Sequence, residues 1–201
     1  MTETGDPVKR AIGWAAAASL CATMTGCLAP EKFTASLNVA PDGSSEYRYE
    51  GTAVHILAAA AIQKQGSLSA KDEAGLQADA AKSAKAPGVK DMRYLGSGRY
   101  QLVIDESLRK GQQATALKLF TMTQAKDGTY TISGPIMKAQ DVAQLQTLAI
   151  KVDGKAEVTL PPNAKVLSQN ATSTPGVFSK TYVWKIGSPA DKPQITFTLA
   201  G

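Results

Sequence analysis

Cysteine and histidine are nearly absent from this 201-residue chain. Its single histidine is His55, and both cysteines, Cys21 and Cys27, lie in the first 27 positions. Structural zinc sites, Cys–His nucleophiles, thioredoxin-type redox centres and disulfide frameworks all require residues that the chain lacks beyond Cys27. Charged residues make up 19% and hydrophobic residues 43%, which argues against a disordered chain or a coiled coil. We therefore expect a globular domain without a metal or other cofactor.

Motifs for catalysis and for nucleic-acid binding are also missing. The sequence contains no Gly-x-Ser-x-Gly elbow, P-loop or Rossmann fingerprint, and its lysines are scattered singly. The acidic pairs Asp72-Glu73 and Asp105-Glu106 have no partner histidine, so we interpret them as helix-start and strand-end charges. His55 lies among apolar residues, where a core or interface role is more common than catalysis. We expect a protein that is not an enzyme and does not bind nucleic acid.

The N-terminus has the pattern of a bacterial export signal. Lys9–Arg10 precedes the uncharged, alanine-rich run Ala11–Ala29. Within this run Met24–Cys27 resembles a lipobox, the sequence at which lipoprotein signal peptides are cut. This pattern predicts that residues 1–26 are removed after Gly26 and that Cys27 receives a lipid with palmitate-type acyl chains. Several acyl chains on one residue are enough for stable anchoring, whereas a single chain is marginal.

Two other interpretations of the N-terminus stay open: an uncleaved membrane-spanning anchor and an ordinary secretory signal. The apolar run is at the lower length limit for a span, and alanine contributes little transfer free energy. Cys21 fits a lipid attachment site less well than Cys27, because the bulky Leu20 precedes it.

Beyond the signal, residues 27–32 are expected to form a short lipidated tether and residues 33–201 a single α+β envelope domain. Leu28 and Ala29 follow Cys27, without the aspartate that retains Gram-negative lipoproteins in the inner membrane. The predicted location is the cell envelope, with the lipid in the membrane. In a Gram-negative source the protein would sit on the outer membrane and face the periplasm.

Alternating apolar and polar residues at the start of the domain indicate an antiparallel hairpin. Phe33–Val39 alternates, Pro41–Ser44 is a turn signal, and Tyr47 then resumes the alternation. A three-residue loop over Asp42–Ser44 would pair Val39 with Tyr47. Two further hairpins are predicted by the same logic across Gly96–Gly98 and Ala125–Gly128.

Helices are predicted after the first hairpin. Val54–Ala61 is apolar and Gly66 ends it, while Ser69 opens a second helix that Pro87 stops. Ala139–Leu148 is compatible with either a short helix or a loop.

The C-terminal half is predicted to be mostly strand. Asp153-Gly154 is rejected as a hairpin turn, because Leu148–Leu160 keeps one apolar face through it. Phe178–Ile186 and Gln194–Leu199 alternate as well. The expected fold class is α+β: an antiparallel, curved β-sheet or sandwich of about eight strands, with two helices near the N-terminal half.

Aromatic side chains fall mostly on the inward strand faces. An ordinary hydrophobic core is the favoured interpretation of this pattern. The functional alternative is a sheet with room for an acyl chain, for which Tyr182 and Trp184 are the tentative ligand-facing aromatics.

Motifs spread over the chain resemble those of the LppM type of small bacterial membrane-anchored lipoproteins, whose function is uncharacterised. They are Cys27 followed by a strand, Asp42-Gly43, Tyr47-x-Tyr49-x-Gly51, Leu160-Pro161-x-x-Ala164-x-Val166, Asn170-Ala171 and Tyr182-x-Trp184. The resemblance implies a β-rich domain exposed in the envelope that binds lipid-like molecules. It carries over no catalytic residue.

Two functions are therefore expected to compete, and a hydrolase that acts on envelope polymers is the weakest third hypothesis because the chain lacks catalytic motifs. The first is a membrane-anchored, non-enzymatic lipoprotein that binds a lipid or other apolar ligand at the cell envelope. The second is a structural or assembly component that binds another envelope protein through a sheet edge. A cavity would favour the first function, and a solid core with a bare edge the second.

Overall fold

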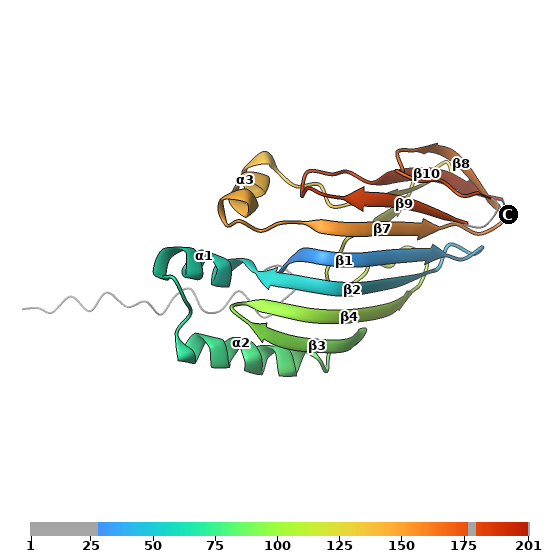
Figure 1. Ribbon diagram of the computed structural model, residues 1–201. Helices are drawn as coiled ribbons and strands as arrows, with labels where there is room; N and C mark the ends of the chain where they lie inside the picture. Colours follow the sequence, from blue (N-terminus) through green and yellow to red (C-terminus); the bar gives the residue numbers. More distant parts are fainter. Residues whose placement is uncertain (1–27, 177–179, 201) are drawn as a thin grey trace, which may run out of the picture.

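The computed structural model describes residues 28–176 and 180–200. The predicted signal peptide, its cleavage site after Gly26 and the lipid attachment site at Cys27 lie outside these residues. The described chain is an α+β fold of ten strands and three helices (Figure 1). The strands are β1 Leu28–Val39, β2 Ser45–His55, β3 Val89–Gly96, β4 Arg99–Leu108, β5 Thr121–Gln124, β6 Tyr130–Ser133, β7 Asp153–Thr159, β8 Ala164–Gln169, β9 Thr181–Ile186 and β10 Gln194–Leu199. The helices are α1 Ile56–Gln65, α2 Ala70–Ser83 and α3 Ala139–Thr147.

The strands form two sheets. A six-stranded sheet has the order β3-β4-β2-β1-β7-β9, and a four-stranded sheet has the order β5-β6-β10-β8. The prediction of a wholly antiparallel fold is wrong for one pair, because β1 and β7 run parallel from Lys32 opposite Asp153 to Asn38 opposite Thr159. The parallel pairing follows from α3, which brings the chain back to the end where β1 begins (Figure 1).

The first hairpin forms in a different register from the predicted one. Tyr47 lies opposite Leu37, and Val39 lies opposite Ser45. The loop does contain three residues, but they are Pro41–Gly43. The N–H of Gly43, at φ +85°, donates to the Ala40 carbonyl at 3.0 Å, and this turn closes one residue earlier than expected. The apolar residues nevertheless keep the predicted face, since the shift moves the register by two positions.

The two predicted helices are present, and α3 is a third. Helix α1 ends at Gly66, whose φ of +83° suits a helix C-terminus. In α2 the Ser69 hydroxyl accepts the Asp72 N–H at 3.1 Å, which is the expected N-terminal cap. The buried Ala80 lies on the side of α2 that packs on the sheet. The segment Ala139–Leu148, which the sequence allows as either helix or loop, forms α3.

Two strand predictions in the C-terminal half need correction. The predicted strand Leu148–Leu160 is shortened to β7, because Leu148 caps α3 and Ile150 packs against Leu145 in a small second core. Strand β7 does run through Gly154, so the rejection of a hairpin there is confirmed. Strand β8 was not predicted at all, and it raises the count to ten.

Both sheets contribute to one main hydrophobic core. Tyr47 and Tyr49 on the six-stranded sheet and Phe197 on the four-stranded sheet are all fully buried. Four ring pairs fill much of this core: Phe33–Tyr49, Tyr47–Phe120, Tyr94–Tyr100 and Tyr130–Phe197, with centroids 5.2–6.2 Å apart. The aromatic residues therefore pack mainly on one another.

Candidate functional site

A cavity of about 280 Å³ lies at the end of the six-stranded sheet where β1 begins. Of its 18 lining residues, only Lys118, Ser188 and Asp191 have polar side chains. The walls come from the start of β1, Ile56 of α1, the segment 117–119, Pro135 and Met137, Leu145 of α3, Val152 and Ala156 in and before β7, and the end of β9 with the loop after it. The cavity is thus assembled from segments that are far apart in the sequence.

Phe33 forms part of the cavity wall, and two glycines allow it to lie there. A Cβ atom on Gly51 would come within 2.2 Å of the Lys32 carbonyl oxygen, so β2 can approach β1 this closely only with glycine. On the other side, a Cβ atom on Gly154 would lie 2.3 Å from the Phe33 ring. The ring also stacks on Tyr49, with centroids 5.7 Å apart. Phe33 is therefore held in place from both neighbouring strands.

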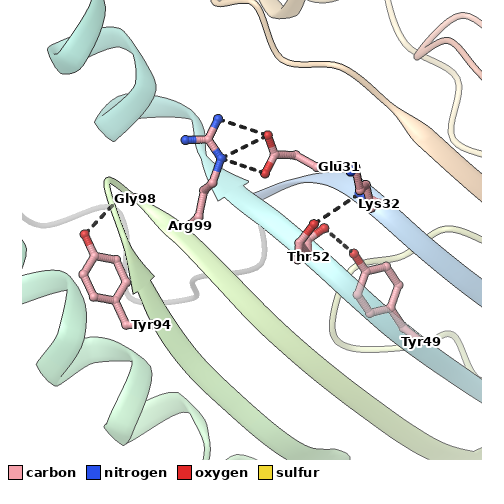
Figure 2. Close-up of polar contacts among 7 residues, drawn as sticks. All are labelled: Glu31, Lys32, Tyr49, Thr52, Tyr94, Gly98 and Arg99. Carbon is pink, nitrogen blue, oxygen red and sulfur yellow. Dashed lines mark hydrogen bonds and ion pairs between the residues drawn. The ribbon is translucent and has the colours of Figure 1, made fainter. Parts of the chain in front are cut away.

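A bulge in β1 lies directly before Phe33, because the pairing with β2 shifts between Pro30 and Phe33. Figure 2 shows the polar contacts that hold this bulge. The carboxylate of Glu31 accepts hydrogen bonds of 3.1–3.3 Å from the Arg99 guanidinium. The backbone N–H of Lys32 donates to the Thr52 hydroxyl at 3.2 Å.

A strap of residues 114–120 covers the inner face beside the cavity and supplies Leu117 and Leu119 to its wall. The Tyr47 hydroxyl donates to the Leu117 carbonyl at 2.6 Å. Leu117 has φ +41°, a left-handed conformation that costs free energy in any residue other than glycine. The hydrogen bond from Tyr47 helps to hold it there. Burial raises the pKa of Tyr47, so its hydroxyl stays protonated and able to donate.

Glu106 of β4 holds the strap through hydrogen bonds. Its carboxylate is buried, and it accepts the Thr115 N–H at 3.0 Å, the Thr115 hydroxyl at 2.9 Å and the Ala116 N–H at 3.2 Å. The two acids of the pair Asp105-Glu106 therefore have different environments. Asp105 is exposed, whereas Glu106 is buried and accepts hydrogen bonds from the backbone of the strap. A buried carboxylate with three such donors is a structural anchor.

The opposite wall consists of α3 and two proline-containing loops. Leu145 of α3, Pro135 and Met137 before it, and Pro189 and Pro193 after β9 all line the cavity. The two loops touch, because the Gly134 N–H donates to the Pro193 carbonyl at 2.9 Å. The loop after β9 is shaped by Asp191, whose carboxylate accepts the N–H groups of Gly187 at 2.8 Å and Ser188 at 2.9 Å. One oxygen of this rim carboxylate, Oδ2, thus serves the backbone of its own loop.

Tyr182 and Trp184 do not line this cavity. Trp184 is buried in the main core, and its indole N–H donates to the Asn170 side-chain oxygen at 2.7 Å. Tyr182 is half-buried two residues earlier on the same face of β9. Ile186, the next residue on that face, is the one that reaches the cavity.

The remaining sequence candidates have structural partners. His55 is the N-cap of α1, and its Nδ1 accepts the Ala58 N–H at 3.3 Å. Asp72 accepts the Ser69 hydroxyl proton, and Glu73 accepts the Tyr94 hydroxyl proton. In residues 28–176 and 180–200 there is no cluster of three or more His, Cys, Asp or Glu side chains.

The cavity could not be predicted from the sequence, because the residues that line it are mostly aliphatic residues and prolines spread from Leu28 to Pro193. No local pattern marks such a site. Phe33 and Ile186 were placed on inward strand faces, but nothing in their alternation distinguishes a cavity wall from a filled core. No helix in the described part of the chain is long and apolar enough to cross a membrane.

Comparison with known proteins gives likeness in fold only, at low sequence identity. No family model matches the chain, and no curated protein matches it. Among solved structures, the NMR structure of the folded domain of the LppM protein of Mycobacterium tuberculosis aligns with a TM-score of 0.38 and 14% identity. The alignment covers 85% of this chain and 91% of that domain.

Proposed function

We propose that this chain is a lipid-anchored, non-enzymatic protein of the bacterial cell envelope that binds an apolar ligand in the cavity beside Phe33. The observation that carries the proposal is the apolar lining of a cavity of about 280 Å³, which begins at Leu28, the residue after Cys27.

The size and chemistry of the cavity suit a hydrocarbon chain. Its volume is near the lower end of the roughly 300–1,000 Å³ that small-molecule pockets occupy. A water molecule needs polar partners, and most of this wall offers none. Each methylene group moved from water into such a site gains about 0.8 kcal/mol, so an acyl chain is the kind of ligand that this wall favours.

The ligand is tested with a photoreactive fatty acid, a palmitate analogue carrying a diazirine, added to membranes that contain the full-length chain. Val152 is buried and lines the cavity, so Val152→Phe should fill it and reduce crosslinking. Val183→Phe is the matched control, because Val183 is half-buried on β9 and does not line the cavity. Crosslinking should map to the strap and to the last turn of α3 around Leu145 in the parent and the control.

Equal crosslinking of both variants would refute ligand binding in this cavity. Ile186→Phe is a second filling variant if Val152→Phe does not fold by circular dichroism. The anchor has a separate test: the intact mass of the membrane-extracted protein should show a lipidated N-terminus at Cys27, which is lost in Cys27→Ser. A full-length, unmodified chain would contradict the anchor without bearing on the cavity.

A second candidate function, assembly with another envelope protein through a sheet edge, is supported by β8. This strand is an edge of the four-stranded sheet, and Leu167 on it is 53% exposed. An unpaired edge with an exposed leucine can accept a strand from a partner. Leu167→Lys should then abolish crosslinking to a neighbouring envelope protein in intact cells and leave the fatty-acid crosslink unchanged.

A further inference from the structure

Two of the most exposed large hydrophobic side chains adjoin the cavity. Ile136 is 83% exposed and Leu57 is 58% exposed. Each is the chain neighbour of a cavity-lining residue, since Ile56 lines the cavity before Leu57 and Pro135 lines it before Ile136. Apolar side chains exposed beside an apolar cavity mark an interaction surface more strongly than isolated ones do.

The point where the chain leaves the described structure lies at the same end. Leu28 lines the cavity and pairs with His55, which directly precedes α1. Residues 28–32, expected to form a tether, are already part of β1. Consecutive Cα atoms are about 3.8 Å apart, so a lipid on Cys27 would hold this end of the domain at the bilayer without a flexible linker between them.

One cation lies at the cavity with the exposed apolar residues. Lys118 is exposed, lines the cavity and makes no ion pair within the described ranges. The carboxylate of Asp191, which also lines the cavity, is engaged by two backbone N–H groups of its own loop. A lysine beside exposed apolar side chains suits the boundary between lipid phosphates and acyl chains.

We propose that the surface formed by Leu28, Leu57, Lys118 and Ile136 rests on the bilayer, so that the cavity opens into it. The ligand is then an acyl chain of a membrane phospholipid, which enters without passing through water. This inference rests on the proposed function, because it places the anchor at Cys27. The bilayer is favoured over a protein partner since the lipid on Cys27 would bring the membrane itself to within one residue of the cavity wall.

The test uses single cysteines, which the domain permits because it has none of its own beyond Cys27. Leu57→Cys and Ile136→Cys are made in the full-length chain, purified from a bacterial host and placed in vesicles of phosphatidylethanolamine and phosphatidylglycerol. Each cysteine carries an environment-sensitive maleimide dye. Leu167→Cys is the matched control, because Leu167 is 53% exposed on β8, away from α1 and α3 (Figure 1).

Dyes at positions 57 and 136 should shift to the blue, be quenched by a nitroxide on the lipid acyl chains and be protected from iodide. The dye at position 167 should show the opposite pattern. Equal iodide quenching at all three positions would overturn the inference and leave the anchor and cavity in place. Protection from iodide without nitroxide quenching would assign the surface to a protein contact and also overturn it.

The parent chain separates failure of the inference from failure of the anchor. A Cys27 thiol that carries a lipid cannot react with the maleimide, and Cys21 is lost with the signal peptide. An unlabelled parent therefore supports the anchor on which the inference rests. A parent that labels would refute that anchor and the inference together.

Discussion

The ring of Phe33 lies so close to Gly154 on the adjacent parallel strand that no other residue fits there without movement. A Cβ atom at position 154 would be 2.3 Å from Cε1 of the ring and 2.4 Å from Cζ. Phe33 is also part of the cavity wall. The glycine in β7 thus sets how much room remains beside the ring.

Gly154→Ala should destabilise the fold by about 1–3 kcal/mol, the usual cost of overpacking. It should also reduce uptake of the photoreactive fatty acid, because the new methyl group would push the Phe33 ring into the cavity. Urea unfolding followed by circular dichroism measures the first effect. Gly75→Ala is the control: Gly75 is exposed in α2 with open space around its Cβ position, so alanine there should stabilise by about 1 kcal/mol.

The double variant Phe33→Leu/Gly154→Ala tests whether the ring is the cause. Leucine is smaller than phenylalanine, so part of the stability lost in Gly154→Ala should return in the Phe33→Leu background. Simple addition of the two single losses would show that the alanine clashes elsewhere.

His55 predicts a pH dependence of stability. Burial lowers the pKa of its imidazole below the ordinary 6.5, and Nδ1 must be unprotonated to accept the Ala58 N–H. Below pH 6.5 the unfolded chain binds the proton more readily than the folded one. Stability should therefore be full above pH 6.5, fall as the pH drops and level off below the folded-state pKa.

The control for this prediction is His55→Asn, which keeps a capping side chain that does not titrate. It should remove the loss of stability between pH 6.5 and the folded-state pKa, whereas His55→Ala should cost about 1 kcal/mol at neutral pH by removing the cap. His55 is the chain's single histidine. An unchanged pH profile in His55→Asn would assign the dependence to carboxylates.

Glu106→Gln should loosen the strap that supplies Leu117 to the cavity. The amide replaces one acceptor oxygen by a donor, which then faces the N–H groups of Thr115 or Ala116. We expect a loss of about 1–3 kcal/mol and faster hydrogen exchange at residues 115–117. Asp105→Asn, at the exposed neighbour, should change neither quantity.

Asn170→Ala should destabilise the packing of β9 by about 1–3 kcal/mol, because it leaves the buried indole N–H of Trp184 without its acceptor. The same asparagine oxygen accepts the Gln194 N–H at 2.8 Å, so β10 is affected too. Fatty-acid crosslinking should persist in the folded fraction, since neither Asn170 nor Trp184 lines the cavity. Asn38→Ala on the exposed side of β1 is the stability control, measured by the same urea unfolding.

The hairpins and the first two helices could be predicted from the sequence because their signals are local. The turn at Gly96–Gly98 is flanked by alternation on both sides, and Tyr94 pairs with Tyr100 as that pattern requires. In the first hairpin the same kind of signal predicts correctly which residues face the core, but it does not predict which residues of β1 and β2 pair. The turn begins one residue earlier, because Gly43 supplies the positive φ that closes it.

The remaining features depend on contacts between distant segments. The parallel pairing of Phe33 with Gly154 joins strands that are far apart in the chain, and no short pattern encodes it. Strand β8 has a weak sequence signal, because only Ala164 and Val166 pack against the core and the strand shows little alternation. The cavity has the same origin, since its walls meet only when β1, α3 and the loop after β9 have come together.

The position of β1 inside the sheet also determines how the domain would resist a pulling force. This strand is paired on one side with β2 and on the other with β7, and its first residue is the one next to Cys27. A pull on the chain at Leu28 is directed along β1, so it loads both ladders of hydrogen bonds in shear at the same moment. The edge strand β9 has a ladder to β7 and, on its other side, only the isolated bridge between Val183 and Ser173 among the described residues. Tension on a lipid anchor at Cys27 would therefore enter the domain through an inner strand of the sheet, which is harder to draw out than an edge strand.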